Sequence, residues 1–386
     1  MAEDDLSRNV YCILGMPIDA IGMPAVLSRI RAAAARREPF LISTPNLNFL
    51  VRSRSDATFR ESLLRSDLCA ADGMPIVWIA RFMGTPVRDR IAGSDIFDAL
   101  KAENDTTRPL NIFFFGGAKG VAGQACQSLN AQRLGLHCAG WFDPGFVSVE
   151  EMSRPEIIEA VNRSAADILV ASLGATKGQY WLLRNHSRLQ TPVRVHLGAV
   201  VNFQAGTVKR APRLMRNAGL EWLWRILEEP HLWRRYGHDG KVLVNLLIGR
   251  VLPLVASNLW RRLRPVRSEF AIDCDQDDHT ITFSLAGPAT ADHIDEAVAV
   301  FRSTPVNRKQ VTVDLSRTLC VDARFLGLIL MLCKVLAGRG VTPLFQGMSP
   351  RIKRGFRLHG LEFLLEPKTG AEKLQTHRAE VEQAFE

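Results

Sequence analysis

The sequence predicts an α/β protein of two domains, the first of them built on a largely parallel sheet. Short apolar runs alternate with helical patterns from residue 10 to residue 200, and a second alternation of this kind begins after Pro265. At 386 residues the chain exceeds the size at which one hydrophobic core keeps growing. A hydrophobic content of 47%, a charged content of 23% and a mean hydropathy near zero are typical of soluble globular proteins and argue against several membrane spans.

Four strands are expected in the first region, each an apolar run that ends in a polar turn. They cover residues 39–46, 111–117, 167–174 and 193–200. Helical patterns lie between them, from about Asp56 to Arg65, from Val121 onward and around Gln179. Because ligands bind at the carboxyl ends of parallel strands, the polar turns predict a site at that edge of the sheet.

The region after Pro265 is expected to form a second, smaller α/β domain. Its strands are predicted at residues 268–275, 279–287, 310–316 and 342–348, and its helices at residues 291–301, at residues 324–337 and from Ser349 onward. We therefore divide the chain into an α/β core at residues 1–204, a basic segment at residues 205–265 and a second α/β domain at residues 266–386.

Positive charge is concentrated between Ala205 and Pro265, where 12 Lys and Arg residues stand against 4 Asp and Glu residues. Such a surface can face nucleic acid, anionic lipid or a phosphorylated substrate. No RNA-binding or zinc-finger signature lies beside it, which argues against nucleic acid. The cations gather around Trp222, Trp224 and Trp233, and they are Lys209, Arg210, Arg213, Arg216, Arg225, Arg234 and Arg235.

The longest apolar stretch runs from Val242 to Arg264. Arg250 and Pro253 fall near its middle, and a charged residue at the centre of a membrane span costs about 2.5 kcal/mol or more. A helix lying in the membrane interface therefore fits better than a transmembrane helix. Its headgroup-level residues would be Trp260, Arg261, Arg262 and Arg264. A helix packed between two domains is the alternative.

Seven cysteines are scattered along the chain without a CxxC pair. This usage predicts a reducing compartment, in which most cysteines serve as small apolar side chains rather than in a metal or redox site. The N-terminus is acidic and lacks an apolar core, so no secretory signal is expected.

Two turns carry the first candidate groups. Thr44 and Asn46 follow an apolar strand and present a hydroxyl and a carboxamide, although a purely structural turn would use the same residues. Asp72, which precedes Gly73, is the candidate general base that removes the proton from an attacking hydroxyl. An Asx-turn or a helix cap is the alternative for Asp72.

Two further turns suit phosphate. Arg90 can hold a diphosphate in a bidentate fashion, while Asp95 either contributes to the substrate site or caps the helix that follows. Gly116 and Gly117 let the backbone and a helix N-terminus approach a phosphate. The spacing is not GxGxxG, so dinucleotide binding is weakly supported, and a nucleotide-sugar diphosphate would make similar demands.

The turn from Gly174 to Trp181 offers Lys177 and Gln179 as substrate-binding candidates. Lys177 can equally be solvated, and Trp181 is expected in the core. Residues 10–240 contain no DxD pair and no cluster of His and Cys ligands, so neither a metal nor another cofactor is expected.

Taken in order, TPN, ADGMPIVWIAR, RIAGSD, FFFGGAKGVA, DILVASLGATKGQYW, GAVVNFQAGTVKRAP and GLEWLWRILEEPHLWRRY resemble the WecG/TagA/CpsF family of bacterial glycosyltransferases, glycosyltransferase family 26. The resemblance covers about residues 10 to 240 and is collinear. It implies a Rossmann-like core and an inverting, metal-independent enzyme. Such an enzyme moves a sugar from a UDP-sugar to a lipid-diphosphate-linked saccharide at the cytoplasmic face of the membrane, in exopolysaccharide or other cell-surface polysaccharide synthesis.

The resemblance also assigns roles to residues. Thr44 and Asn46 match the family's TxN site, Asp72 matches its proposed catalytic base, and Arg90 matches the Arg before its GSD turn. The family's C-terminal appendage is implied to close over the active site and to hold the membrane and the diphosphate-lipid acceptor. It is matched here by Lys209, Arg210 and the helical stretch that carries Arg225, Arg234 and Arg235.

Two departures from the family pattern concern the expected donor pocket. The family commonly has PKQE where this chain has Thr176 to Gln179, so that Gly178 replaces Gln and Gln179 replaces Glu. It also commonly has FD where this chain has Val201 and Asn202. N-acetylmannosamine is therefore not assumed as the donated sugar, and glucose, N-acetylglucosamine or another hexose is equally open.

The C-terminal region resembles a STAS domain, the fold of anti-sigma-factor antagonists and sulfate-transporter tails. Signalling members are phosphorylated on a Ser after a loop Asp, and the equivalent pair here is Asp322 and Ala323. Alanine cannot accept a phosphoryl group, so docking or assembly is expected instead, with a protein partner or a homo-oligomer left open. A catalytically silent scaffold of a polysaccharide assembly complex is the alternative to an active enzyme.

Overall fold

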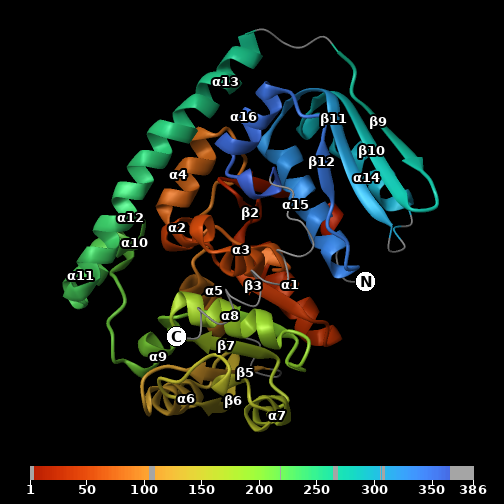
Figure 1. Ribbon diagram of the computed structural model, residues 1–386. Coiled ribbons are helices and arrows are strands. Elements are labelled where there is room, and N and C mark those ends of the chain that lie inside the picture. The colour runs from red at the N-terminus through yellow and green to blue at the C-terminus, as the bar shows by residue number, and fades with distance from the viewer. Residues whose placement is uncertain are drawn as a thin grey trace. The chain divides into compact units, whose positions relative to one another are not determined.

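The computed structural model describes residues 4–103, 109–217, 219–263, 268–304, 306 and 309–365. The chain forms two compact units (Figure 1). The large unit comprises Asp19–Trp78 and Val87–Val244, and the small unit comprises Met1–Ile18, Ile79–Pro86 and Asn245–Glu386. The small unit therefore combines the N-terminal segment with the C-terminal region. The predicted domain boundaries, at residues 204 and 265, place these two segments in different domains.

A six-stranded sheet forms the centre of the large unit, in the order β4-β3-β8-β7-β5-β6. All of its neighbouring strands are parallel, which confirms the predicted α/β fold class. The four predicted strands are present, together with β4 and β6. The strands are β3 (Phe40–Ser43), β4 (Leu68–Cys69), β5 (Leu110–Gly116), β6 (Leu136–Phe142), β7 (Ile168–Ser172) and β8 (Val193–His196).

Helices cover both faces of this sheet, because both faces of its strands are apolar. One face packs against helices α1, α5, α6 and α9. On the other face, Trp181 of α8 stacks on Phe115 of β5 at a centroid distance of 4.1 Å, which confirms Trp181 as a core residue. The helices are α1 (Met23–Arg36), α2 (Leu47–Ser55), α3 (Ala57–Leu64), α4 (Met74–Phe82), α5 (Gly93–Ala102), α6 (Val121–Gln132), η2 (Glu151–Ser153), α7 (Pro155–Arg163), α8 (Ala175–Asn185) and α9 (Val200–Ala205).

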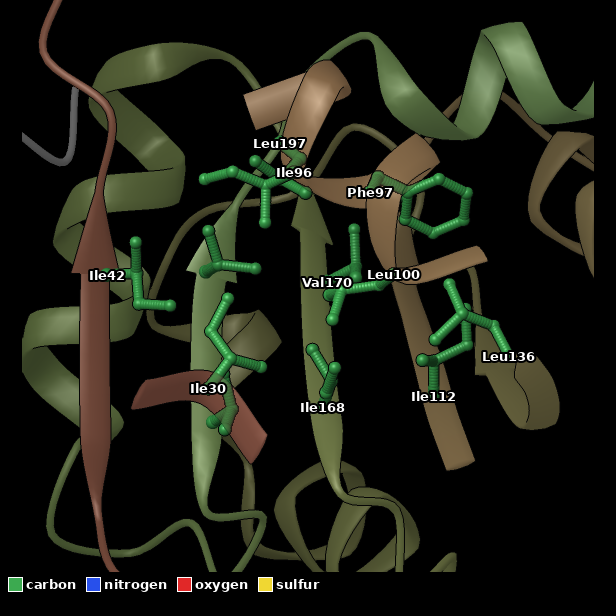
Figure 2. A pocket seen from close by; sticks show the side chains of 12 residues that line it. Ile30, Ile42, Ile96, Phe97, Leu100, Ile112, Leu136, Ile168, Val170 and Leu197 are labelled. Carbon is green, nitrogen blue, oxygen red and sulfur yellow. The ribbon is translucent and has the colours of Figure 1, made fainter. Parts of the chain in front are cut away.

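A cavity of about 20 Å³ lies in the core between the sheet and helices α1 and α5 (Figure 2). Its lining is wholly apolar and includes Ile30, Ile112 and Val170. A space of this size holds at most about one water molecule, and here the water would find no polar partner. The cavity is therefore a packing defect of the core rather than a substrate site.

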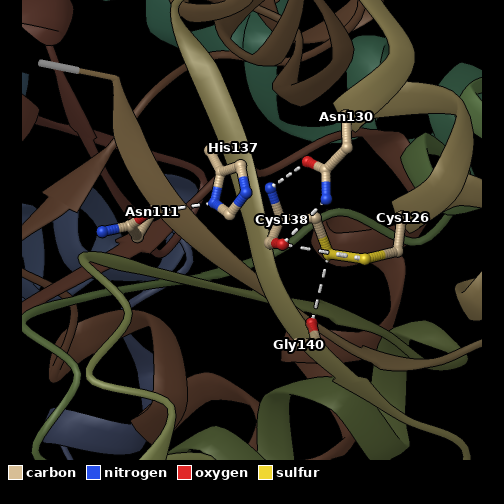
Figure 3. Close-up of a disulfide and its surroundings, with 6 residues drawn as sticks. All are labelled: Asn111, Cys126, Asn130, His137, Cys138 and Gly140. Atoms are coloured by element: carbon tan, nitrogen blue, oxygen red, sulfur yellow. Dashed lines mark hydrogen bonds between the residues drawn. A yellow bond between two sulfur atoms is a disulfide. The ribbon is translucent and has the colours of Figure 1, made fainter. Parts of the chain in front are cut away.

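Cys126 of α6 and Cys138 of β6 form a disulfide, with their Cα atoms 5.3 Å apart (Figure 3). This pair is an exception to the prediction that most of the cysteines serve as small apolar side chains. Strand β6 packs against α6, and this contact brings the two residues together although 12 positions separate them. The prediction is confirmed for Cys12, Cys69 and Cys320, which are free and buried.

A chain of helices follows the sheet of the large unit. Helices α10 (Arg213–Asn217), α11 (Glu221–Glu228) and η3 (Pro230–Leu232) lead into one long helical stretch. This stretch consists of α12 (Trp233–Leu246), the π-helical turn η4 (Leu247–Val251) and α13 (Leu252–Leu263). The π-helical turn ends two residues before Pro253, which has no N–H to donate to an ordinary helical hydrogen bond.

The stretch Trp233–Arg261 is long and apolar enough to cross a membrane, judged by length and composition alone. Only a small part of its most apolar segment is buried within the protein. Arg250 is not left in an apolar environment, because its guanidinium pairs with Glu362 and donates to the carbonyl of Arg357. Arg264 lies outside the described residues, and the side chains of Arg213 and Arg262 are not described.

The small unit contains a four-stranded mixed sheet in the order β12-β11-β10-β9. Alternate residues of β10 are buried, as expected for a strand with one face on a core. The predicted strands and helices are all present. They are β9 (Ala271–Gln276), β10 (Thr280–Ala289), η5 (Ala291–His293), α14 (Ile294–Ser303), β11 (Gln310–Val321), α15 (Ala323–Gly338), β12 (Leu344–Gln346), α16 (Pro350–Leu358) and η6 (Glu362–Leu364).

The N-terminal segment packs on α15 of the small unit. It consists of η1 (Asp5–Ser7) and a hairpin of β1 (Val10–Ile13) and β2 (Met16–Asp19). Arg324 of α15 donates to the carbonyl of Val10 at 3.2 Å. Gly327 lies so close to that carbonyl that a Cβ would overlap it, so glycine is needed for this approach.

Candidate active site

The carboxyl ends of β3 and β4 hold the loops that carry Asp72. The amide of Asp72 donates to the carbonyl of Pro45 at 2.9 Å, and the amide of Ile91 donates to the carbonyl of Ala71 at 2.8 Å. These backbone bonds place Asp72 between the turn that follows β3 and the segment that leads into α5. The parallel topology thus brings three of the predicted motifs to one edge of the sheet.

Asp72 is poised to exchange a proton near neutral pH. Burial, together with the negative charges of Glu221 and Asp95, raises the pKa of its carboxyl to about 7, although Arg90 and the amide of Gly93 oppose the rise. About 24% of the side chain is exposed, so a substrate can reach it. A general base works best with a pKa near the working pH.

Arg90 lies among three carboxylates. Its Nη2 atom is 2.7 Å from Asp95, and its Nη1 atom is 3.2 Å from Glu221 and 4.0 Å from Asp72. The side chain is only 15% exposed. In this position the guanidinium is oriented by its partners and faces the candidate base.

Asp95 joins Arg90 to the basic segment. It accepts from Arg210 and, at 3.2 Å, from Arg216, while Arg210 also pairs with Asp98 and donates to Ser94 at 2.8 Å. The N-cap of α5 is Ala92, which makes no side-chain cap, so Asp95 does not cap this helix.

Three arginines of the basic segment each have one hydrogen-bond donor without a partner among the described residues. Within the described part of the chain, the Nε atoms of Arg210, Arg216 and Arg225 are buried and have no hydrogen-bond partner. A buried N–H without a partner is unfavourable, and an anionic group entering the site would supply acceptors. Arg225 also pairs with Glu229 at 3.3 Å.

Thr44 and Asn46 flank Asp72 in different ways. Thr44 is buried, and a Cβ added at Gly93 would lie 3.4 Å from its hydroxyl oxygen. Asn46 accepts from the amide of Phe49 at 3.2 Å and so forms the N-cap of α2. The structural role that was the alternative for this turn therefore uses the side-chain oxygen of Asn46. The side-chain nitrogen of Asn46 is still able to donate a hydrogen bond.

Gly116 and Gly117 end β5 with φ values of 97° each, a region that favours glycine. The amide of Gly117 donates to the carbonyl of Ser172 at 2.9 Å, so this turn lies beside the end of β7. A Cβ at Gly116 would lie 2.8 Å from that same carbonyl oxygen. Close packing with β7 is therefore one reason for a glycine at this position.

Lys177 and Gln179 are not brought to the Asp72 cluster. Gln179 is 1% exposed, and its carboxamide bonds to the hydroxyl of Ser43 within the core. Lys177 donates to the carbonyl of Val147 at 3.2 Å. The substrate-binding roles of both residues stay predictions.

The two departures from the family pattern have distinct structural settings. Gly178 lies against the ring of His196, and a Cβ there would stand 2.8 Å from Nε2. His196 is buried with Nε2 2.7 Å from the carbonyl of Leu173, and burial lowers its pKa. Val201 is a core residue, whereas Asn202 is half-buried in the first turn of α9 and its carbonyl accepts from Thr207.

Lys209, Arg234 and Arg235 of the basic segment are exposed. The carbonyl of Lys209 accepts from the indole of Trp224 at 3.0 Å, while the lysine side chain faces solvent. Arg234 and Arg235 lie over the rings of Trp233 and Tyr236 at 5.8 and 5.0 Å. Cation–π contacts of this kind suit a surface that meets anionic groups.

Sequence reasoning missed Glu221 and gave Arg216 no specific role. Glu221 begins α11 and reaches Arg90, although 131 positions separate the two residues. The clustering of cations and tryptophans drew attention to the basic side of this helix. An acid at the start of a helix reads as an ordinary charge–dipole contact, so its pairing with the strand-end site is visible only in the folded chain.

The fold is that of an α/β protein with a candidate base, Asp72, at the strand ends and arginines around it. The family model for the glycosyl transferase WecG/TagA/CpsF family matches residues 11–254. The chain belongs to this family and is a glycosyltransferase, as its ordered motifs predicted.

Two Bacillus proteins are among its relatives. Both are named N-acetylglucosaminyldiphosphoundecaprenol N-acetyl-beta-D-mannosaminyltransferase. The one from Bacillus spizizenii is 28% identical over 194 residues, covering 50% of this chain and 73% of its own length. The one from Bacillus subtilis is 26% identical over 195 residues, covering 50% and 74%.

A crystal structure of an antisigma-factor antagonist, a STAS domain from Rhodobacter sphaeroides, matches the fold over 22% of this chain and 99% of its own. The sequence identity is 13% and the TM-score is 0.19. A match at this TM-score does not assign the small unit, so its STAS-like character stays a prediction.

Proposed function

We propose that this glycosyltransferase moves a sugar from a UDP-sugar to a lipid-diphosphate-linked saccharide, with inversion at the anomeric carbon and without a metal. The observation that carries the proposal is the cluster in which Asp72, with its pKa of about 7, faces Arg90 at the strand ends. The names of the two Bacillus relatives, which transfer a sugar to a lipid-diphosphate-linked N-acetylglucosamine, support the acceptor class.

In the proposed reaction Asp72 takes the proton from the acceptor hydroxyl as its oxygen attacks the anomeric carbon. The new C–O bond forms while the bond from that carbon to the diphosphate oxygen breaks, and UDP leaves with the electron pair. Arg90 and the arginines of the basic segment stabilise the negative charge that develops on the leaving group. Attack from the face opposite to UDP gives inversion.

The Nε donors of Arg210, Arg216 and Arg225, which have no partner in the described part of the chain, support a diphosphate ligand. Guanidinium groups bind phosphate oxygens through charge-assisted hydrogen bonds. The donor diphosphate and the lipid diphosphate of the acceptor have the same chemistry, and both are substrates of the proposed reaction. Thr44 and Asn46, at the next strand end, are the proposed contacts to the sugar.

A peripheral position on the membrane is part of the proposal. Helices α12 and α13 and the turn η4 between them expose Trp233, Ile248, Leu252 and Trp260, each more than half accessible. Apolar and aromatic side chains on one helical stretch, with arginines beside them, suit the interface between headgroups and acyl chains. An acceptor held by a lipid anchor is presented at this level.

The test uses the purified full-length protein, a panel of UDP-sugars and a synthetic lipid-diphosphate N-acetylglucosamine acceptor. Release of UDP with one donor, and a product whose anomeric configuration is inverted, is the expected result, unchanged by a chelator. Asp72→Asn is expected to slow transfer about 10²–10⁴-fold. Asp89→Asn, which changes an exposed carboxylate nearby, serves as the matched control.

A catalytically silent scaffold is the second candidate, and the TKGQ and VN departures favour it. Gln179 is enclosed in the core and Gly178 packs on His196, so neither offers the carboxylate or amide that the family pattern places there. A scaffold releases no UDP with any donor in the panel. Transfer at the parent rate by Asp72→Asn would instead overturn the assignment of the base.

In the small unit, Asp322 has a structural role. It forms the N-cap of α15 by accepting from Phe325 at 2.8 Å, and it also accepts from Ala291 at 2.8 Å. With Ala323 following it, the loop offers no hydroxyl for phosphorylation. We propose docking or assembly with a protein partner or a second copy as the role of this unit.

A further inference from the structure

Helix α16 of the small unit carries an unusually one-sided charge. Ile352 and Phe356 are buried, and the side chains on the opposite face are exposed cations. No acid occurs between Ser349 and Leu361. The exposed cations are Arg351, Lys353, Arg354 and Arg357.

These cations are not used inside the protein. Within the described ranges, no ion pair joins the side chains of α16 to an acidic group. The contacts of α16 with the core are made by other groups, such as the ring of Phe356, which lies 6.1 Å from that of Phe345. Within the described residues the charge of its outer face is therefore available for a ligand.

The position of α16 indicates which ligand this is. The helix packs against η4 and α13 of the same unit. Arg250 of η4 fixes the contact by donating to the carbonyl of Arg357 at 2.6 Å and by pairing with Glu362 just beyond α16. The helix that carries the cations therefore lies beside the apolar helical stretch.

Helix α13 and the turn before it expose apolar side chains over the same stretch. Leu259, Trp260 and Leu263 are each more than half accessible, as is Leu252. Apolar side chains gain nothing from nucleic acid or from an acidic protein surface. A bilayer that carries negative lipids offers acyl chains to the apolar side chains of α13 and headgroup phosphates to the cations of α16.

We infer that α16 is a second membrane-contact element, which binds the anionic headgroups of a phospholipid bilayer beside the apolar face of α13. The small unit then gives the enzyme its preference for anionic lipid. The inference rests on the proposed peripheral position of the protein, and it adds a lipid-recognising surface outside the basic segment.

The test measures co-sedimentation of the full-length protein with phosphatidylcholine vesicles, with and without phosphatidylglycerol. The triple variant R351E/K353E/R354E is expected to lose at least about tenfold in partitioning to the anionic vesicles at low salt, since each cation near such a surface contributes about 1 kcal/mol. Binding of the parent should also fall as salt is added.

A control with the same change in charge is K309E/R317E/R339E, which alters cations of this unit outside α16. It should bind anionic vesicles nearly as the parent does. Thermal unfolding of each variant checks that the fold is retained, and all three substituted positions of α16 are exposed.

Equal binding of parent and α16 variant to anionic vesicles would overturn the inference, and so would equal binding of the parent to neutral vesicles. Loss of binding to RNA but not to vesicles would assign α16 to nucleic acid instead. Transfer to a water-soluble, short-chain acceptor separates the two proposals. The rate of this transfer should be unchanged in the α16 variant. If the parent protein shows no such transfer, that result would count against the proposed function alone.

Discussion

Glu221 of α11 lies 3.2 Å from Arg90, the residue that faces the candidate base. The basic segment therefore contributes an acid as well as its arginines to the strand-end site. Because Glu221 raises the pKa of Asp72 while Arg90 lowers it, the two residues act on the base in opposite directions. A segment that the sequence presents as a binder of anions thus also influences the pKa of the candidate base.

The pH dependence of transfer should follow Asp72. The carboxylate form is the active base, so kcat/KM is expected to rise with pH and to level off above an inflection near 7. Glu221→Gln replaces the carboxylate with a neutral group of nearly the same shape, so this inflection should move to lower pH. The exposed Glu228→Gln on the same helix is the control, and an inflection that it shifts equally would contradict the specific role of Glu221.

Arg90→Met should have the opposite effect on the inflection. Loss of the nearby positive charge leaves the ionised form of Asp72 less stabilised, so the pKa of its carboxyl rises and the inflection moves to higher pH. The limiting rate should also fall, by about 10²-fold or more, because Arg90 is proposed to stabilise departing UDP. Unchanged kinetics at all pH values would remove Arg90 from the site.

The stability of the fold should show the cost of keeping Asp72 charged. Its pKa is about 7 in the folded chain against 3.8 for an ordinary Asp, so the folded chain binds the proton more tightly than the unfolded chain. This contribution to stability is fully present below pH 3.8 and is lost as pH rises through 7. Asp72→Asn should therefore raise the melting temperature at pH 8, and this gain should shrink toward pH 4.

Gly178 and His196 should depend on one another. A Cβ at position 178 overlaps the imidazole ring, so Gly178→Ala is expected to lower the free energy of unfolding by about 1–3 kcal/mol. His196→Ala removes the ring and should relieve most of that loss in the double variant. Additive losses in a double-mutant cycle would show that the two side chains do not compete for this space.

The sequence by itself determined the α/β class, the succession of strands and helices and the ordered motifs of the family. These features are local, because a strand and its polar turn are written in consecutive residues. Thr44 and Asp72 could be placed at strand ends for this reason. The local pattern left two roles open for Asp95, and the structure shows that it pairs with three arginines instead of capping α5.

Only the tertiary structure decided which distant residues meet. The pairing of Glu221 with Arg90, the enclosure of Gln179 against Ser43 and the disulfide between Cys126 and Cys138 all join separate elements. The packing of the N-terminal hairpin on α15 is of the same kind. Periodicity records which face of an element is buried but not which element covers it, and that choice depends on the packing of the whole chain.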